Sequence, residues 1–222
     1  MFERGLIRAL ISDSLNDARR LALRNFSLLC GESKMLPIPG FDYGNSPSEF
    51  DALSFRGKSA VLWTTNGTKA IGAAAQARSV LVASLLNRRA AAQRLLEEAR
   101  RQNADPIVLC AGLERGALFS LEDSVAAGAV VEAARDADEG IELADDAWAA
   151  LHLWRWYRGD AMRAFRHAVH GRALAAAGFE GDLRFASQVD VFETVPVLYD
   201  EDGVKTLRAK PKTRTTRPAS SL

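Results

Sequence analysis

Short apolar runs alternate with longer amphipathic segments along this chain, and this alternation limits its possible folds more than any other feature. Runs rich in β-branched and apolar residues predict strands of about five residues at 26–30, 59–64, 79–83, 106–110, 183–186 and 195–198. Helical spacing of apolar residues predicts helices at 12–25, 68–77, 87–102, 121–135, 144–158 and 160–177. Such βαβ units favour an α/β fold, with a mostly parallel sheet and helices on both faces.

The length of 222 residues suits one domain, and we expect a single α/β domain over residues 1–204. The net charge of +1 hides an uneven distribution, because residues 205–222 carry basic side chains and no acidic ones. With two prolines and almost no apolar residue, this basic tail is predicted to be disordered. Residues 1–204 have an acidic balance, which argues against nucleic-acid binding and leaves only the tail for such a contact.

No run of about 18 apolar residues is present, and the N-terminus lacks the apolar core of a secretion signal. Cys30 and Cys110 each end an apolar run, where a buried reduced thiol is the ordinary interpretation. Two cysteines alone form neither a disulfide framework nor a zinc site. We therefore expect a cytoplasmic protein that does not cross a membrane.

Ligands of parallel α/β folds bind beyond the carboxyl ends of the strands, which directs attention to the loops at 30–33, 64–68, 84–87 and 110–114. The loop at 64–68 is the most informative, because hydroxyls, an amide and a glycine follow a strand directly and a helix begins there. Such a turn presents backbone N–H groups and a positive dipole end to an anion. A capped turn without a ligand explains the same residues, and from this segment alone it is the simpler explanation.

Carboxylates supply the next class of candidates, with Asp42, Glu122 and Asp123 in or beside the predicted loop face. Mg²⁺ needs one or two carboxylates together with substrate phosphate oxygens and water. Because Glu122 and Asp123 begin a predicted helix, complementation of its dipole explains them equally well. His167 and His170 are three residues apart on a predicted helix, but two ligands without a third make a thin case for a metal.

The strings GFDYGNSP at 40–47 and TTNGTKA at 64–70 occur in this order along the chain. They resemble the signatures GFDxGNSP and TTNGT(R/K)A of the 2-phosphosulfolactate phosphatase family. Weaker matches follow at 84–87, 110–112, 121–123, 127–128, 170–172, 178, 182 and 195–197. The resemblance covers residues 18–200, and its specificity comes from the first two strings occurring together.

The resemblance implies a phosphoric monoester hydrolase that uses Mg²⁺ and converts (2R)-O-phospho-3-sulfolactate to 3-sulfolactate, a step of coenzyme M biosynthesis. Its partner would be a small phosphorylated hydroxy acid. On this hypothesis we assign the catalytic set to Asp42, Asn45, Asn66, Glu122 and Asp123. Glu122 and Asp123 would hold Mg²⁺. The substrate would bind at Thr64, Thr65, Gly67, Thr68, Lys69 and Arg172.

Two departures from the family pattern bear on activity. The family opens with a strand carrying an Asp-Val-Leu-Arg-Ala-Thr/Ser-like motif, which has no match at 1–15, so we expect the sheet to lack the family's first strand. The family's Gly-Glu-Arg is Gly31-Glu32-Ser33 here. The alternative hypothesis is therefore an N-terminally truncated, catalytically impaired relative that binds an anion or a partner without turnover. The tryptophan-rich helices favour a homodimer, and the oligomeric state stays open.

Overall fold

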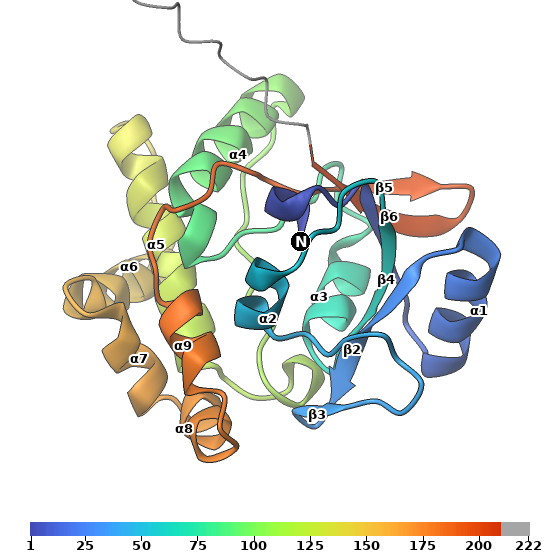
Figure 1. Ribbon diagram of the computed structural model, residues 1–222. Helices are drawn as coiled ribbons and strands as arrows, with labels where there is room; N and C mark the ends of the chain where they lie inside the picture. Colours follow the sequence, from blue (N-terminus) through green and yellow to red (C-terminus); the bar gives the residue numbers. More distant parts are fainter. Residues whose placement is uncertain (210–222) are drawn as a thin grey trace, which may run out of the picture.

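The computed structural model describes residues 1–209, and a mixed sheet lies at the centre of this part of the chain (Figure 1). Its strands are β1 (Arg8–Ile11), β2 (Leu28–Ser33), β3 (Leu36–Pro37), β4 (Ser59–Trp63), β5 (Val197–Glu201) and β6 (Val204–Arg208). The strand order is β3-β2-β4-β1-β6-β5. The central strands β2, β4 and β1 run parallel, whereas β3 and β6 are antiparallel to their neighbours. The predicted α/β class with a mostly parallel core is confirmed.

Helices cover both faces of the sheet because successive strand side chains point to opposite sides. Leu10 and Val61 pack on one face against α1 (Leu15–Asn25). The opposite face is covered by α2 (Pro47–Ala52) and α3 (Gly67–Ala74). The helix starts follow from local capping, since Ser14 accepts a hydrogen bond from the Asp17 backbone N–H before α1.

A second group of helices packs beside the sheet. Its members are α4 (Arg88–Gln102), α5 (Leu121–Ala137), α6 (Asp145–Tyr157), α7 (Ala161–His167), α8 (Val169–Ala176) and α9 (Glu180–Ala186). Helix α5 is buried along most of its length, and α4 and α6 pack against it (Figure 1). A Cβ atom at Gly128 would lie 1.9 Å from the Ala150 carbonyl oxygen, so only glycine permits this approach of α5 to α6. Within residues 1–209, none of the helices is long and apolar enough to cross a membrane.

Three predicted strands are wrong or incomplete. Residues 183–186 belong to the helix α9. The prediction failed because a run of four residues is too short to distinguish the helical repeat from the strand repeat of hydrophobic residues. Residues 106–110 are extended, but they pair with no strand of the described chain, and Ile107 is 82% exposed. In 79–83 only Leu81 forms a bridge, to Val197 of β5. Strand formation depends on a neighbouring strand, which an apolar run does not reveal.

The ends of the chain also differ from the prediction. β1 lies in the centre of the sheet although no strand was predicted there, and the residues before it form the 3-10 helix η1 (Phe2–Arg4) and no strand. The tail boundary at 205 is wrong, because Lys205–Arg208 lie in β6, where Thr206 is fully buried. Residues 210–222, the remainder of the predicted tail, lie outside the described residues.

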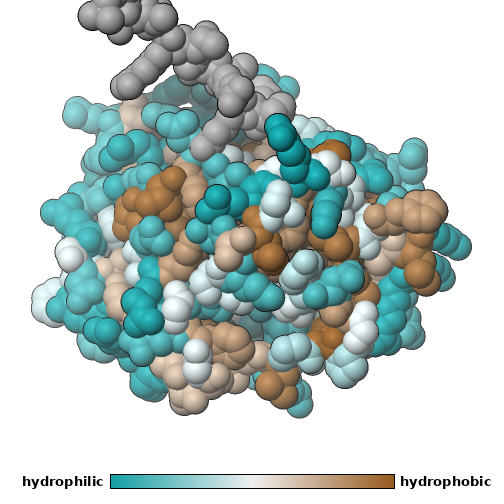
Figure 2. Space-filling model, in the orientation of Figure 1, coloured by the Kyte–Doolittle hydropathy of each residue, from teal (hydrophilic) through white to brown (hydrophobic). Residues whose placement is uncertain are grey.

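The predicted helix at 160–177 is divided at Ala168 into α7 and α8. On the face of the molecule that Figure 2 shows, hydrophobic residues occur in small groups between hydrophilic ones. That face therefore presents no single large apolar area for a partner subunit. The homodimer stays a prediction.

Candidate functional site

Part of the predicted site gathers at one edge of the sheet, where β2 and β4 end. In Figure 1 this is the lower edge, which also holds β3, the coil before α5, and α8. The Arg115 backbone N–H donates to Asn66 Oδ1 at 3.0 Å, and the Gly112 backbone N–H donates to Asp123 Oδ2 at 2.7 Å. One loop at 110–118 thus joins the N-terminus of α3 to the N-terminus of α5. The structure brings the amide of Asn66 and the carboxylate of Asp123 to this common loop.

The turn between β4 and α3 is closed by its own threonines. Thr64 Oγ1 accepts from the Thr68 backbone N–H at 3.1 Å, and Thr68 Oγ1 donates to the Thr64 carbonyl at 2.9 Å. Both hydroxyls therefore serve as caps of the turn. The first N–H groups of a helix have no intrahelical partner, so Asn66 and Gly67 can present theirs to an anion. Gly67 is exposed at this position.

Glu32 lies at the end of β2 and faces the same turn. Its Oε1 accepts from the Thr65 backbone N–H at 2.8 Å, and its Oε2 accepts from Thr65 Oγ1 at 3.2 Å and from the Met35 backbone N–H at 3.0 Å. Glu32 was not among the predicted site residues. Two signals were available: its position directly after a predicted strand, since parallel neighbouring strands end at the same edge, and its match to the Glu of the family's Gly-Glu-Arg string.

Asp123 is partly buried in an environment of mostly neutral groups. Burial raises the pKa of its carboxyl above the ordinary value, against the opposing effects of the Gly112 N–H and of His170. Burial also raises the pKa of the neighbouring Cys110 thiol, and it raises the pKa of Cys30 to about 12. Both thiols are therefore neutral at neutral pH and poor nucleophiles. His170 belongs to this environment, although its sequence context suggested only a polar helix segment.

Glu122 and Asp123 could offer oxygen ligands to a metal ion, but they form no complete metal cage. Oε2 of Glu122 is buried and has no hydrogen-bond partner among the described residues. Residues 1–209 contain no group of three or more His, Cys, Asp or Glu side chains arranged to hold a metal ion. One or two carboxylates, completed by substrate phosphate and water, are the usual protein contribution to Mg²⁺, whereas zinc takes three or four protein ligands. The donor set fits Mg²⁺.

The GFDYGNSP segment lies along β2. Asp42 Oδ2 accepts from the Leu29 backbone N–H at 2.8 Å, so this carboxylate fastens the segment to the strand. The Gly44 carbonyl accepts from the Gly31 N–H at 3.1 Å, and the exposed Asn45 is the next residue of this segment, which runs parallel to β2. The structure therefore places Asn45 toward the site edge and gives Asp42 a structural contact.

The two predicted substrate-binding cations lie on different helices. Lys69, on α3, donates from Nζ to the Asp13 carbonyl. Arg172, on α8, donates from Nη1 to the His167 carbonyl. Two positions apart on a helix, Arg172 and His170 lie on different faces, and no contact in the described residues joins Arg172 to the turn at 64–68.

The loop at 84–87 lies at the opposite edge of the sheet, which corrects the expectation that it shares this site. Leu81 pairs antiparallel with Val197 of β5. Strand β5 is antiparallel to β6, and β6 is antiparallel to β1, so β5 runs in the same direction as β1. The segment before Ser84 therefore runs against β1, and its end faces away from the carboxyl edge. We predicted that 79–83 runs parallel to the other strands, and nothing in its local sequence indicates the opposite direction.

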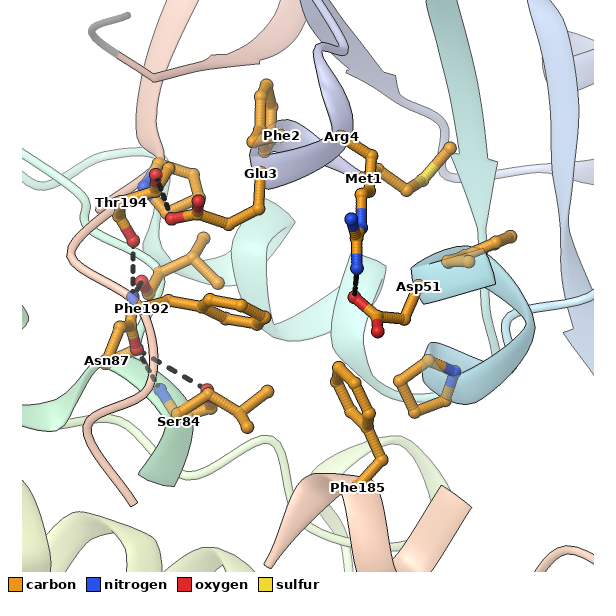
Figure 3. A pocket seen from close by; sticks show the side chains of 16 residues that line it. Met1, Phe2, Glu3, Arg4, Asp51, Ser84, Asn87, Phe185, Phe192 and Thr194 are labelled. Atoms are coloured by element: carbon orange, nitrogen blue, oxygen red, sulfur yellow. Dashed lines mark hydrogen bonds and ion pairs between the residues drawn. The ribbon is translucent and has the colours of Figure 1, made fainter. Parts of the chain in front are cut away.

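A cavity of about 220 Å³ lies next to this loop, between η1, α2 and α9 (Figure 3). Figure 3 shows the rings of Phe185 and Phe192 around it, together with the ion pair of Arg4 and Asp51 at 2.5 Å. Ser84 and Asn87 also line it, but none of the predicted site residues does. The cavity is thus separate from the edge where the candidate site lies.

A family model described as 2-phosphosulpholactate phosphatase matches residues 1–201. A probable 2-phosphosulfolactate phosphatase of Symbiobacterium thermophilum is 38% identical over 171 residues, which are 77% of this chain and 71% of the relative. The protein with the same description from Deinococcus radiodurans is 38% identical over 178 residues, 80% of this chain and 71% of the relative. One from Caldanaerobacter subterraneus is 34% identical over 175 residues, 79% and 70% of the two chains.

Proposed function

The chain belongs to the 2-phosphosulfolactate phosphatase family, and on this premise we propose that it is a phosphoric monoester hydrolase. Its proposed substrate is 2-phosphosulfolactate or a similar small phosphorylated hydroxy acid, which it would hydrolyse to phosphate and the free hydroxy acid. The reaction matches the printed names of its relatives. A cytoplasmic location and a place in coenzyme M biosynthesis belong to the same proposal.

The observation that carries the proposal is the loop at 110–118, which contacts two helix N-termini at once. It fixes Asn66 before α3 and Asp123 in the first turn of α5. Phosphoryl transfer to water depends mainly on positioning and charge neutralisation. A helix N-terminus that binds the phosphate and a carboxylate nearby that holds a cation provide both.

Mg²⁺ is the proposed cofactor, held by Asp123 and by Glu122, whose Oε2 has no hydrogen-bond partner within residues 1–209. When bound, the ion would neutralise charge on the phosphate oxygens. The chain's own contribution is to keep Asp123 oriented through the Gly112 N–H and to hold the start of α3 at the same loop through the Arg115 N–H and Asn66. Both helix N-termini direct positive dipole ends toward anionic groups.

The remaining predicted residues take supporting roles in this proposal. Lys69 is the nearer cation for the second anionic group of the substrate, because it lies in the first turn of the same helix as the phosphate-binding N–H groups. Thr64 and Thr68 shape the turn through their hydrogen bonds to each other, and Thr65 through its hydrogen bond to Glu32. Asp42 and Asn45 order the segment along β2. Arg172 would assist only at the periphery.

Phosphate release from 2-phosphosulfolactate and from a panel of phosphorylated hydroxy acids tests the proposal, with Mg²⁺ and with EDTA. Asp123→Asn should abolish most of the release, because the amide cannot replace a charged oxygen ligand. Asp138→Asn is the matched control, since Asp138 caps the other end of α5 and pairs with Arg100. It should retain full activity.

Each outcome of this assay distinguishes the alternatives. Release that depends on Mg²⁺ and on Asp123 supports the proposed phosphatase. Release that survives both EDTA and Asp123→Asn would refute the assigned metal ligands. A folded protein that binds phosphate and releases none from any substrate would favour the impaired relative that binds an anion without turnover.

A further inference from the structure

We propose that Glu32 is a positioning residue, which acts through Thr65 to hold the turn before α3 in the geometry that binds phosphate. The inference rests on the proposed function, because it assigns a role to a residue beside that site. Glu32 itself need not touch the substrate.

The position of Glu32 in the sheet explains why it can act on this turn. The last pair of the parallel β2–β4 ladder is Gly31 with Trp63, and β4 ends there. Glu32 then accepts the Thr65 N–H at 2.8 Å with its side chain, so the carboxylate continues the pairing past the end of the strand. The start of α3 is thereby tied to β2.

The same carboxylate also binds two further donors. Oε2 accepts from Thr65 Oγ1 at 3.2 Å and from the Met35 N–H at 3.0 Å. Met35 lies in the tight turn between β2 and β3, where both Lys34 and Met35 have left-handed backbone angles. Glu32 therefore joins two turns at one edge of the sheet, and it fixes both the N–H and the hydroxyl of Thr65.

Its partners distinguish Glu32 from the carboxylates of this protein that form ion pairs. Glu132 and Glu201 each form ion pairs with arginines, whereas Glu32 has no ion pair among the described residues. A half-buried carboxylate held only by neutral donors gives up hydration without gaining a counter-charge. An ionised carboxylate only accepts hydrogen bonds, so its two oxygens suit three converging donors. An amide side chain has one accepting oxygen and one donating NH₂ group, and it would not suit them. The arrangement serves local geometry more than stability.

The consequence concerns the next residues in the chain. Once both donors of Thr65 are fixed, the Asn66–Gly67 segment that follows has little freedom, and its N–H groups stay in place. Preorganised donors bind a phosphate without the cost of ordering the loop. Without Glu32, the turn retains its Thr64–Thr68 hydrogen bonds but loses its attachment to β2.

Glu32→Ala, Thr65→Val and the double variant test the proposal, with Glu201→Ala as the matched control. Glu201 is a half-buried carboxylate on β5, and its partners are Arg8 and Arg208. The readouts are KM and kcat for 2-phosphosulfolactate, the dissociation constant of inorganic phosphate by calorimetry, and the urea midpoint. Thr65→Ser, which keeps the hydroxyl, serves as the conservative rescue.

We expect Glu32→Ala to raise KM and the phosphate dissociation constant about tenfold, a loss of roughly 1.4 kcal/mol. The double variant should be no worse than Glu32→Ala, because Glu32 acts through Thr65. Thr65→Ser should keep more of the phosphate binding than Thr65→Val, because the hydroxyl can still donate to Glu32. Glu201→Ala should lower the urea midpoint with KM and phosphate binding unchanged.

The failure of this proposal and the failure of the proposed function give different results. If the wild type hydrolyses substrate and Glu32→Ala behaves like Glu201→Ala, the positioning role is refuted and the phosphatase stands. If the wild type releases no phosphate but binds it, and Glu32→Ala weakens that binding, the positioning role stands without the reaction. If the wild type neither hydrolyses substrate nor binds phosphate, both are refuted.

Discussion

Two of the carboxylates on helix α5, Glu132 and Asp123, lie in opposite environments. Glu132 accepts hydrogen bonds from Trp154 Nε1 at 2.5 Å and from Arg158 at 3.0 Å, and Arg88 and Arg155 lie close by. Asp123 accepts the Gly112 N–H at 2.7 Å, and no arginine or lysine pairs with it among the described residues.

The two pKa shifts follow from these surroundings. Burial alone would raise the pKa of Glu132, but the Trp154 and Arg155 hydrogen bonds and the nearby arginine charges outweigh it and lower the pKa. Burial prevails at Asp123 and raises its pKa. The comparison shows that a carboxylate paired with arginines has its charge occupied by structural ion pairs. A carboxylate held by neutral donors can still accept a cation or a proton.

The largest effect we expect is on catalysis. Asp123→Asn should lower kcat/KM for 2-phosphosulfolactate by 100- to 1,000-fold, as removal of one preorganised charged group does in other enzymes. The free energy of unfolding should change by less than about 1 kcal/mol, because the amide oxygen still accepts the Gly112 N–H. Steady-state kinetics and urea denaturation of the same preparation measure both quantities. A variant that unfolds easily yet keeps its activity would reverse the roles of the two carboxylates.

Glu132→Ala should have the opposite profile. Its removal leaves the half-buried charge of Arg88 less compensated and Trp154 Nε1 without its acceptor, so the free energy of unfolding should fall by about 3 kcal/mol. Arg155 and Arg158 are partly exposed and regain water, which keeps the loss from being larger. Urea denaturation checks the value. Glu132→Gln, which keeps an acceptor for Trp154, should lose less, and equal losses would contradict this explanation.

The cations extend the comparison. Lys69 contacts a neutral carbonyl, so its charge is available to a substrate, and Lys69→Ala should raise KM about tenfold with little change in stability. Arg172→Ala should change KM less than threefold, because its helix position separates it from the turn at 64–68. Initial rates over a range of substrate concentrations measure both. A larger effect at Arg172 than at Lys69 would place the second anionic group of the substrate near α8.

Local sequence signals predicted the long helices better than the strands, although α2 was not predicted and α9 was predicted as a strand. Ser14, Ser46 and Ser120 each cap a helix through a bond formed within three residues, but Ser46 lies in a segment where no helix was predicted. The runs SAVLW at 59–63 and PIVLC at 106–110 have the same character, yet only the first is a buried strand. The difference lies in the partners, since β4 is enclosed by β2 and β1.

The residues of the candidate site also differ in how far local sequence could predict them. The turn at 64–68 could be predicted because strand, glycine and helix start are contiguous. Glu32 and His170 reach the site from other elements, through the strand pairing of β2 and the packing of α8. Their roles depend on the tertiary arrangement, which no short string specifies. The roles of the other predicted site residues stay predictions until the kinetic experiments are done.

The smallest effect we expect is the dependence of stability on pH, and it has opposite signs for the two carboxylates. The folded protein binds the proton of Asp123 more tightly than the unfolded chain does. Its contribution to the free energy of unfolding therefore decreases as pH rises from about 4, the ordinary value, to the raised pKa. The lowered pKa of Glu132 gives the reverse, because its contribution is complete above about 4.5 and is lost as pH falls through the folded pKa.

Urea denaturation of the wild type, Asp123→Asn and Glu132→Gln between about pH 3 and 7 isolates these two contributions, since each variant removes one titrating group. The stability of the wild type relative to Asp123→Asn should decrease with rising pH. Its stability relative to Glu132→Gln should increase over the acidic part of the range. Two difference curves with the same slope would mean that both carboxylates are neutralised alike. Asp123 would then lose its distinction as the carboxylate left free for a cation.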